Sequence, residues 1–155
     1  MEVNYLDILK PDDWHLHLRE GHILSRVLPY TYDNFGSALV MPNLDNPITN
    51  ISLAETYYTE ICRQIPEGIK FTPYMTLYLT NRLTKDEIKK VGTHEYIKAI
   101  KMYPKGATTN SGSGISNITE FYPLFEAMEK NGVILSIHGE VTDEKVDVFE
   151  RETVF

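Results

Sequence analysis

Two histidines near the amino-terminal end of the chain have the spacing of a metal site on a β-strand. They are His15 and His17, in the stretch PDDWHLHLR at residues 11–19. Side chains two residues apart point to the same face of a strand, so both imidazoles would converge on one point. Imidazole is a good ligand for zinc and related metals. A lone H-x-H also arises by chance, so the spacing predicts a metal site only together with its surroundings.

Further polar side chains stand where other predicted strands end. They are Arg19, just after the histidines, and Asn43, Lys101 and His138 in residues 37–43, 97–103 and 133–139. In a β/α barrel the active site is built at the carboxyl ends of the strands. Each residue alone has an ordinary interpretation: a strand cap for Asn43, a snorkelling surface amine for Lys101, a satisfied core imidazole for His138. Their shared position at strand ends favours one common site.

Strand-like and helix-like segments alternate along the chain. Strands are expected at residues 12–18, 37–43, 71–80, 97–103 and 133–139, and helices at 22–34, 52–65, 84–91, 116–130 and from 142 onward. The first ten residues are interpreted as a lead-in or an edge strand. This β-α order predicts an α/β fold with a parallel sheet and helices packed on it.

Local signals set the expected helix starts. Ser52 with Glu55 and Thr84 with Glu87 have capping-box spacing. Ser116 or Asn117 is expected to begin a long helix ending at Asn131-Gly132, and Thr142 to begin a last helix with Val146 and Phe149 on one face. The segment KGATTNSGSG at residues 105–114 is small, polar and rich in glycine, so it is predicted to be a mobile loop.

Composition excludes several classes of function. The chain has 155 residues, 42% hydrophobic, enough for one domain with its own core. A formal net charge of −7 argues against nucleic acid or an anionic membrane as the main partner. The single cysteine, Cys62, allows no internal disulfide and fits a cytoplasmic setting. We expect no signal peptide and no membrane span, since no apolar run approaches the ~20 residues a span needs.

Four blocks of sequence together resemble a known family. They are PDDWHLHLR at residues 11–19, VMPN at 40–43, KMYPKGATTNS at 101–111 and IHGE at 137–140. Their order and spacing are similar to those of the bacterial single-chain dihydroorotases, of the amidohydrolase superfamily. The resemblance implies a TIM-like barrel and a metal-dependent cyclic amide hydrolase. The implied reaction is the reversible cyclisation of N-carbamoyl-L-aspartate to L-dihydroorotate in pyrimidine biosynthesis.

The resemblance also implies a role for each candidate residue. His15 and His17 would bind the more buried of two zinc ions, and His138 the second. Lys101 would be carboxylated on its ε-nitrogen and bridge both ions. The substrate carboxylate would be held by Arg19 and Asn43, and a loop carrying Thr108 and Thr109 would close over the substrate.

The chemistry accounts for these residue types. A free ammonium group cannot ligate a metal, whereas a carbamate offers two oxygens and a negative charge. Two metal ions roughly 3.5–4 Å apart can polarise an amide carbonyl and acidify a shared water. An arginine matches a carboxylate with two parallel hydrogen bonds, which a lysine cannot form.

The chain departs from the family in length. The family is about twice as long, and five of the eight barrel strands are expected in residues 1–155. The chain is therefore interpreted as the amino-terminal part of one barrel domain. A further histidine ligand and the general acid/base aspartate would lie beyond Phe155, so the isolated chain is expected to be inactive, and the full-length protein a homodimer.

Two other functions remain open on the sequence. A hydantoinase or allantoinase is the nearest rival, although Arg19 and Asn43 favour a substrate with a free carboxylate. A partial barrel that binds metal weakly, or only associates with a partner chain, is the non-catalytic alternative.

Overall fold

The computed structural model describes residues 7–155, and it confirms the alternation of strands and helices. Part of the expected lead-in, residues 1–6, lies outside the described residues, and residues 7–10 form no strand. The elements in chain order are β1 (Asp12–Leu16), α1 (Gly21–Asn34), β2 (Ser37–Val40), α2 (Ile51–Arg63), β3 (Thr72–Tyr78), α3 (Lys85–Val91), β4 (Ile97–Met102), the 3₁₀ helix η1 (Ile118–Phe121), α4 (Tyr122–Lys130), β5 (Ile134–Ile137) and α5 (Arg151–Val154).

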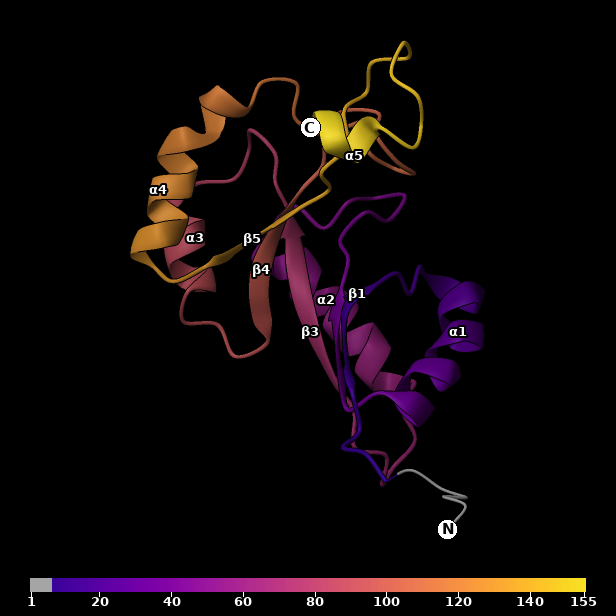
Figure 1. The fold of residues 1–155 in the computed structure, drawn as a ribbon. Coiled ribbons are helices and arrows are strands. Elements are labelled where there is room, and N and C mark those ends of the chain that lie inside the picture. The colour runs from indigo at the N-terminus through magenta and orange to yellow at the C-terminus, as the bar shows by residue number, and fades with distance from the viewer. Residues whose placement is uncertain (1–6) are drawn as a thin grey trace.

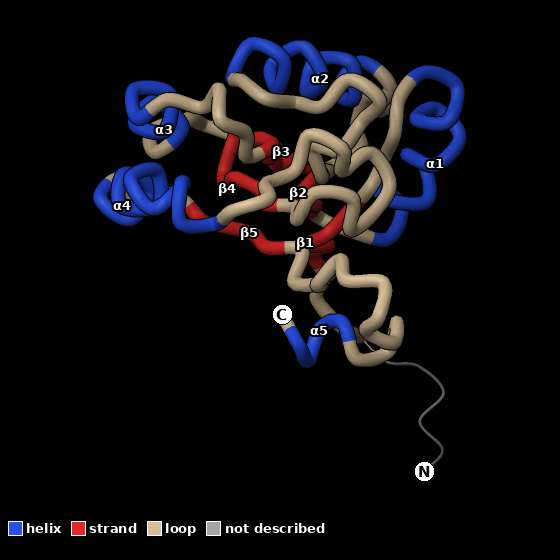
Figure 2. Tube along the Cα trace, turned by 90° about the horizontal axis from the view of Figure 1, so that it is seen from above, coloured by secondary structure: helices blue, strands red, loops and turns tan. Residues whose placement is uncertain are grey.

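The five strands form one parallel sheet in the order β1-β2-β3-β4-β5. The sheet is a curled half-barrel, with α1 to α4 around its outer face (Figures 1 and 2). Sequential strands lie side by side because each helix returns the chain to the next position in the sheet. The carboxyl ends of all five strands therefore meet at one end of the half-barrel, as expected.

The two faces of the sheet carry different side chains. Met75, Leu77 and Leu79 belong to the large apolar cluster that includes the helices. Leu39 and Ala99 belong to a second, smaller cluster. Side chains alternate along a strand, so every second residue of β4, counted from Ala99, faces the concave interior. The strand-end residues of the predicted site follow the same alternation.

Strand β1 carries a register shift between Asp13 and Leu16, the stretch that includes His15. Asp13 pairs with Ala38 and Leu16 with Val40, so three steps along β1 match two along β2. A bulge of this kind turns a strand locally and re-aims its side chains. The strand ends at Leu16, two residues earlier than predicted, and Leu18 is nonetheless buried in the main core.

The helix starts follow the predictions in part. Thr84 accepts a hydrogen bond from the backbone N–H of Glu87 and caps α3, as predicted. The expected cap at Ser52 is wrong, because the side chain of Asn50 caps α2 instead. Asparagine is among the best capping residues, and here it lies directly before the first helical residue. The carboxylate of Glu87 accepts from the N–H of Ile51, so α3 also supports the start of α2.

The region after β4 differs from the single long helix that was predicted. Asn117 is the cap, and its side-chain oxygen accepts a hydrogen bond from the backbone N–H of Thr119. The first turn is the 3₁₀ helix η1, and the α-helical part begins only at Tyr122, with Pro123 in its first turn. Proline is tolerated there because the first amides of a helix have no intrahelical partner.

The last predicted helix is wrong over most of its length. Helix α5 spans only Arg151–Val154, and Phe149 is exposed rather than packed on a helix face. The side chains of Asp143 and Asp147 accept hydrogen bonds from backbone N–H groups two residues ahead. Such local bonds offer the backbone an alternative to the helix, so residues 142–150 form turns.

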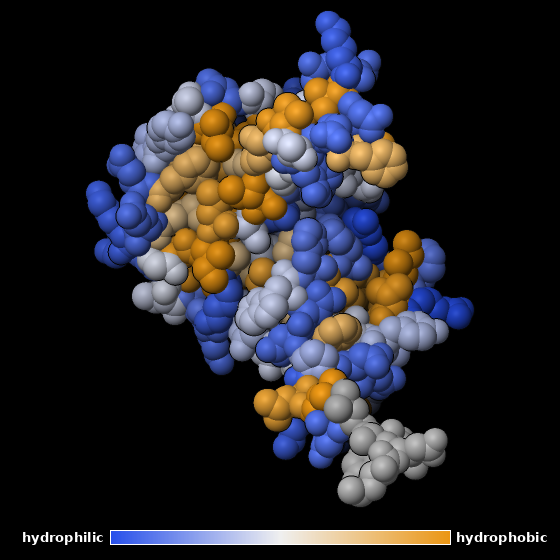
Figure 3. Space-filling view, in the orientation of Figure 1, coloured by the Kyte–Doolittle hydropathy of each residue, from blue (hydrophilic) through white to orange (hydrophobic). Residues whose placement is uncertain are grey.

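The last strand shows where the sheet ends. Ile134, which pairs with Ala99, and Ile137, which pairs with Met102, are about half exposed on the two faces of β5. Figure 3 shows apolar side chains where β5 lies in Figure 1. Strands β1 and β5 form the two edges of the sheet. No helix within residues 7–155 combines the length and apolar character that a membrane crossing requires.

Candidate metal and substrate site

The histidine pair converges as the strand periodicity predicted. The Nε2 atoms of His15 and His17 lie 3.3 Å apart, and their ring centroids are 5.2 Å apart. His15 is the penultimate residue of β1, and His17 directly follows the strand. The two imidazoles thus offer nitrogen atoms to the same point at the carboxyl end of the sheet.

The surroundings favour the neutral form of both histidines. Burial lowers the pKa of His17 to about 4, with further lowering by the charges of Arg19 and His15. Burial also lowers the pKa of His15, and the charges of Lys101 and His138 lower it further. A neutral imidazole keeps a lone pair for a metal, whereas a protonated one has none. The pair is therefore ready to ligate a metal at neutral pH.

Lys101 lies in the interior of the half-barrel. It is in step with Ala99 on β4, its side chain is 2% exposed, and it pairs with Tyr78 of β3. Its ammonium nitrogen stands 5.3 Å from the ring centroid of Tyr103. Within residues 7–155 it forms no ion pair. Burial therefore lowers the pKa of the amine, because the charged form loses solvation without gaining a carboxylate.

His138 reaches the same region from the neighbouring strand. Its backbone N–H donates to the carbonyl oxygen of Met102, and its ring lies 5.9 Å from that of Tyr103. The Nε2 atom is buried and makes no hydrogen bond. Glu140 Oε1 is 3.1 Å away, within ion-pair distance but not aligned as an acceptor, so this contact contributes only if the imidazole is protonated.

The predicted metal ligands thus gather at one end of the sheet, but they do not form a closed set. Within residues 7–155, no three His, Cys, Asp or Glu side chains are grouped tightly enough to hold a metal ion. Two histidines come from β1, and the lysine and the third histidine come from β4 and the end of β5. In the order of the sheet, Lys101 on β4 therefore lies between the histidine pair and His138.

Arg19 is held in an unusual backbone conformation beside the histidines. Its φ is +59°, in the left-handed region that residues other than glycine seldom adopt. The hydroxyl of Tyr57 on α2 donates a 2.6 Å hydrogen bond to the Arg19 carbonyl oxygen. The Arg19 guanidinium reaches the carbonyl oxygen of Asn43 at 3.4 Å. The helix layer therefore fixes the direction in which this arginine leaves the strand end.

Asn43 is buried, and both its amide nitrogen and its amide oxygen form hydrogen bonds within the chain. The Nδ2 group donates to the carbonyl oxygen of Thr109, and Oδ1 accepts from the hydroxyl of Tyr103. Its contact with His17 raises the pKa of that imidazole, against the stronger effect of burial. Asn43 consequently joins the end of β2, the end of β4 and the loop at residues 105–114.

The same loop folds back on itself and on the end of β2. The Ser111 hydroxyl is buried and exchanges hydrogen bonds with the backbone of Thr108. Asn110, with φ of +57°, donates to the Asn43 carbonyl oxygen and to Asp45 Oδ1. Thr108 is half-buried and Thr109 is exposed. Of the two predicted loop threonines, Thr109 contacts Asn43 through its carbonyl oxygen and Thr108 contacts Ser111. The mobility of the loop is still a prediction.

The sequence interpretation missed three residues that organise the site. Tyr103 follows Lys101 by two positions, so the period-2 rule already placed it on the same strand face. Asn110 is of a type that tolerates a left-handed conformation, which was a usable signal. Tyr57 had no such signal, because its bond to Arg19 joins residues 38 apart in sequence.

Comparison with known proteins gives an independent assignment. No family model matches the chain. A dihydroorotase of Yersinia enterocolitica is 53% identical over 150 residues, which are 97% of this chain and 43% of that protein. A dihydroorotase of Cupriavidus necator is 47% identical over 97% of this chain and 44% of that protein. The chain is similar in sequence to part of a dihydroorotase. It spans less than half the length of these relatives.

Solved structures agree with the sequence comparison. A Campylobacter jejuni dihydroorotase superposes with a TM-score of 0.85 at 35% identity, covering 94% of this chain and 41% of that one. A Saccharomyces cerevisiae dihydroorotase in complex with 5-fluoroorotic acid gives 0.82 at 34% identity, covering 94% and 42%. An L-hydantoinase from Arthrobacter aurescens gives 0.60 at 15% identity and shows the barrel fold alone.

Proposed function

We propose that the chain is part of a zinc-dependent dihydroorotase that interconverts N-carbamoyl-L-aspartate and L-dihydroorotate. The observation that carries this proposal is the convergence of the histidine pair with Lys101 and His138 at the carboxyl end of the half-barrel. Similarity to dihydroorotases over 97% of the chain supports the same reaction class. As these relatives are more than twice as long, the activity is assigned to a protein that contains the rest of the barrel.

The residues present fit a pair of zinc ions. His15 and His17 direct Nε2 atoms at one point, and the buried Nε2 of His138 makes no hydrogen bond. We assign the first two to one ion and His138 to the other. When bound, the ions would supply Lewis-acid polarisation of the scissile amide carbonyl.

Lys101 is proposed to be carboxylated and to bridge the two ions. Its burial depresses the amine pKa, which leaves more of the nucleophilic free base to react with carbon dioxide. The product carries a negative charge near His15 and His17, whose pKa is lowered by burial and which are therefore neutral, so it requires cations for stability. Carboxylation and metal binding should therefore depend on each other.

Arg19 and Asn43 are proposed to hold the substrate carboxylate, with Thr108 and Thr109 above it. The left-handed turn and the bond from Tyr57 keep the arginine fork at the strand end. Asn43 uses one Nδ2 hydrogen for the carbonyl oxygen of Thr109, which leaves its second Nδ2 hydrogen for a substrate. Substrate binding and the present loop contact are thus compatible at this amide.

We further propose that residues 1–155 form the amino-terminal part of a single barrel domain. Five parallel strands of a curled half-barrel leave β1 and β5 as edges, and a TIM barrel closes with eight strands. The general acid/base aspartate and the remaining ligands are then supplied by the missing strands. The complete protein is proposed to act as a cytoplasmic homodimer that takes a small-molecule substrate and binds neither nucleic acid nor a membrane.

The proposal is tested by complementation. The chain is expressed with and without the carboxyl-terminal half of the Yersinia enterocolitica relative, supplied with zinc, and assayed for dihydroorotate turnover. Turnover only in the combined sample is expected, with loss of activity in Lys101→Ala. Hydrolysis of hydantoin in preference to dihydroorotate would assign the chain to the rival class. Absence of both activities, with less than one zinc per chain, would support a non-catalytic module.

A further inference from the structure

A cavity lies at the same end of the sheet, separate from the histidines and Lys101. Its volume is about 840 Å³, within the range of small-molecule sites. It is bounded by the segments that follow β2, β3 and β4, which supply residues 46, 47, 49, 80–82, 112–117, 120 and 121. None of the metal or substrate residues proposed above lines it. The function assigned to this chain therefore leaves the cavity without a role.

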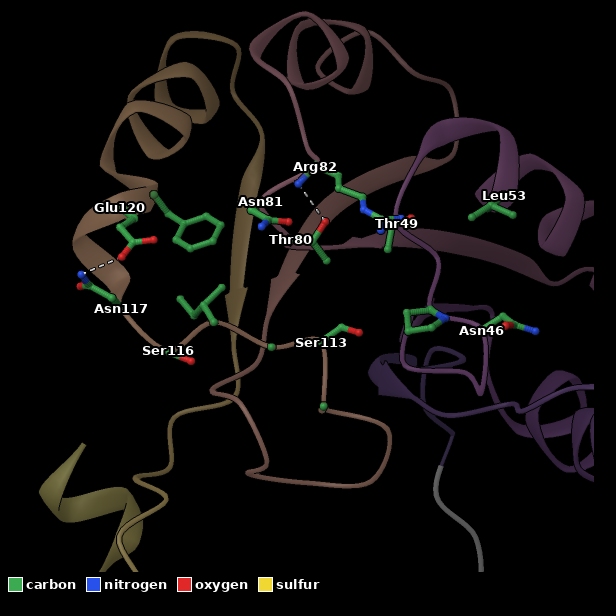
Figure 4. A pocket seen from close by; sticks show the side chains of 15 residues that line it. Asn46, Thr49, Leu53, Thr80, Asn81, Arg82, Ser113, Ser116, Asn117 and Glu120 are labelled. Carbon is green, nitrogen blue, oxygen red and sulfur yellow. Dashed lines mark hydrogen bonds between the residues drawn. The ribbon is translucent and has the colours of Figure 1, made fainter.

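The cavity has a cationic side and an anionic side. Figure 4 shows Arg82 with Thr49 on one side, Glu120 with Asn117 on the other, and Thr80 between them. Within residues 7–155 the Arg82 guanidinium forms no ion pair and donates no hydrogen bond, while its backbone N–H donates to the Thr80 hydroxyl. An arginine without a carboxylate partner is free to receive an oxyanion.

The opposite side suits a cationic group. Glu120 accepts one hydrogen bond, at Oε1 from the side chain of Asn117, and its second carboxylate oxygen makes none within the described residues. A carboxylate has about four acceptor positions, so most of its capacity remains for a ligand. Both charged residues are exposed, which makes the site accessible and its affinity modest.

The floor between the charged sides is apolar. Ile115 and Phe121 line the cavity and are 8% and 7% exposed, and Leu53 lines it from α2. An aliphatic linker lying on this surface would remove apolar area from water. The cavity thus combines an oxyanion receptor, an apolar middle and a cation receptor.

We propose that this cavity binds a small dipolar molecule, with a carboxylate or phosphate on Arg82 and an ammonium group on Glu120. The linker between these groups is a short aliphatic chain. Residues 112–116 belong to the segment that continues from the loop of Thr108 and Thr109. A bound ligand would therefore touch the chain that leads out of the proposed substrate loop.

The test uses saturation-transfer NMR on the 155-residue chain, which works for both monomeric and associated protein. The probes are 4-aminobutyrate, 6-aminohexanoate and O-phosphoethanolamine, with butyrate and butylamine as single-ended controls. We expect binding of a two-ended probe and weaker binding of both controls. A stronger signal from O-phosphoethanolamine than from the amino acids would assign the oxyanion as phosphate, and the reverse order as carboxylate.

Variants separate the two sides of the cavity. Arg82→Gln should weaken the binding of the two-ended probe and of butyrate about fivefold, as expected for an exposed charged contact. The binding of butylamine should not change. Glu120→Gln should weaken the binding of the two-ended probe and of butylamine but not the binding of butyrate. Arg26→Gln on α1 and Glu126→Gln on α4 are the matched controls, and circular dichroism verifies each fold. Saturation transfer that is absent in the wild type, or unchanged in both cavity variants, would overturn the proposal.

Discussion

The conformation of Asn110 leads to a quantitative prediction about the loop above the proposed substrate site. Asn110 has a φ of +57° and donates hydrogen bonds of 3.3 Å to the Asn43 carbonyl oxygen and 3.0 Å to Asp45 Oδ1. Asn110→Gly removes both bonds but keeps the backbone unstrained. Asn110→Ala removes both bonds and also places a β-carbon in the left-handed region.

The two variants should differ by the backbone strain alone. Two partly exposed hydrogen bonds contribute about 1.4 kcal/mol together to the closed loop. The left-handed conformation adds about 1 kcal/mol for alanine. Because 1.4 kcal/mol corresponds to about a tenfold change, local opening should increase about tenfold in the glycine variant and about fiftyfold in the alanine variant.

Hydrogen exchange at single amides measures this opening. The N–H groups of Gly106 and Ser111 donate to backbone carbonyl oxygens inside the loop and report its closure. Their exchange rates should increase by the two factors above, while amides of β3 keep their rates. Asn34→Ala, which removes a side-chain bond at the end of α1, is the control and should leave both loop amides unchanged. Equal exchange rates in the glycine and alanine variants would refute the predicted backbone strain at residue 110. Wild-type exchange rates in both variants would refute a stabilising role for the two side-chain hydrogen bonds of Asn110.

Three further predictions concern the proposed metal and substrate site. His15→Ala should reduce zinc bound to the complemented protein and abolish turnover, so full zinc content by mass spectrometry of metals would remove His15 from the ligand set. Arg19→Lys should lower kcat/KM for dihydroorotate by at least about tenfold with zinc retained, because a lysine keeps the charge but loses the bidentate fork; an unchanged kcat/KM would exclude the contact. Tyr57→Phe removes the 2.6 Å hydrogen bond to the Arg19 carbonyl oxygen and should lower the free energy of unfolding, measured in urea, by about 1 kcal/mol. Tyr30→Phe, at an exposed side chain, is the control and should leave the free energy of unfolding unchanged.

The sequence by itself determined the features that depend on local periodicity. Alternation along a strand placed His15 and His17 on one face, and the β-α order predicted a parallel sheet whose strand ends meet. Capping chemistry located the start of α3 at Thr84. These signals are readable because each depends on residues that are two to four positions apart and on backbone geometry common to all strands and helices.

Local signals also conflicted, and there the prediction was wrong. Thr142 resembled a helix cap, but Asp143 and Asp147 bond to amides two residues ahead, and turns replace the helix. Ser52 matched a capping box, whereas Asn50 is the residue whose side-chain oxygen accepts a hydrogen bond from the free amide of Leu53 in α2. Both errors involve side chains of similar capping ability, between which short-range spacing does not discriminate.

Only the tertiary structure decided how the site is held. The hydroxyl of Tyr57 meets the carbonyl oxygen of Arg19 across 38 residues, and that of Tyr103 meets Asn43 across 60. These contacts depend on how far the sheet curls and how α2 lies against it, so no periodicity in the sequence specifies them. They determine where the arginine fork points and what the buried amide can still bind. The sequence therefore identified the chemical groups, whereas long-range packing set their directions and their available bonds.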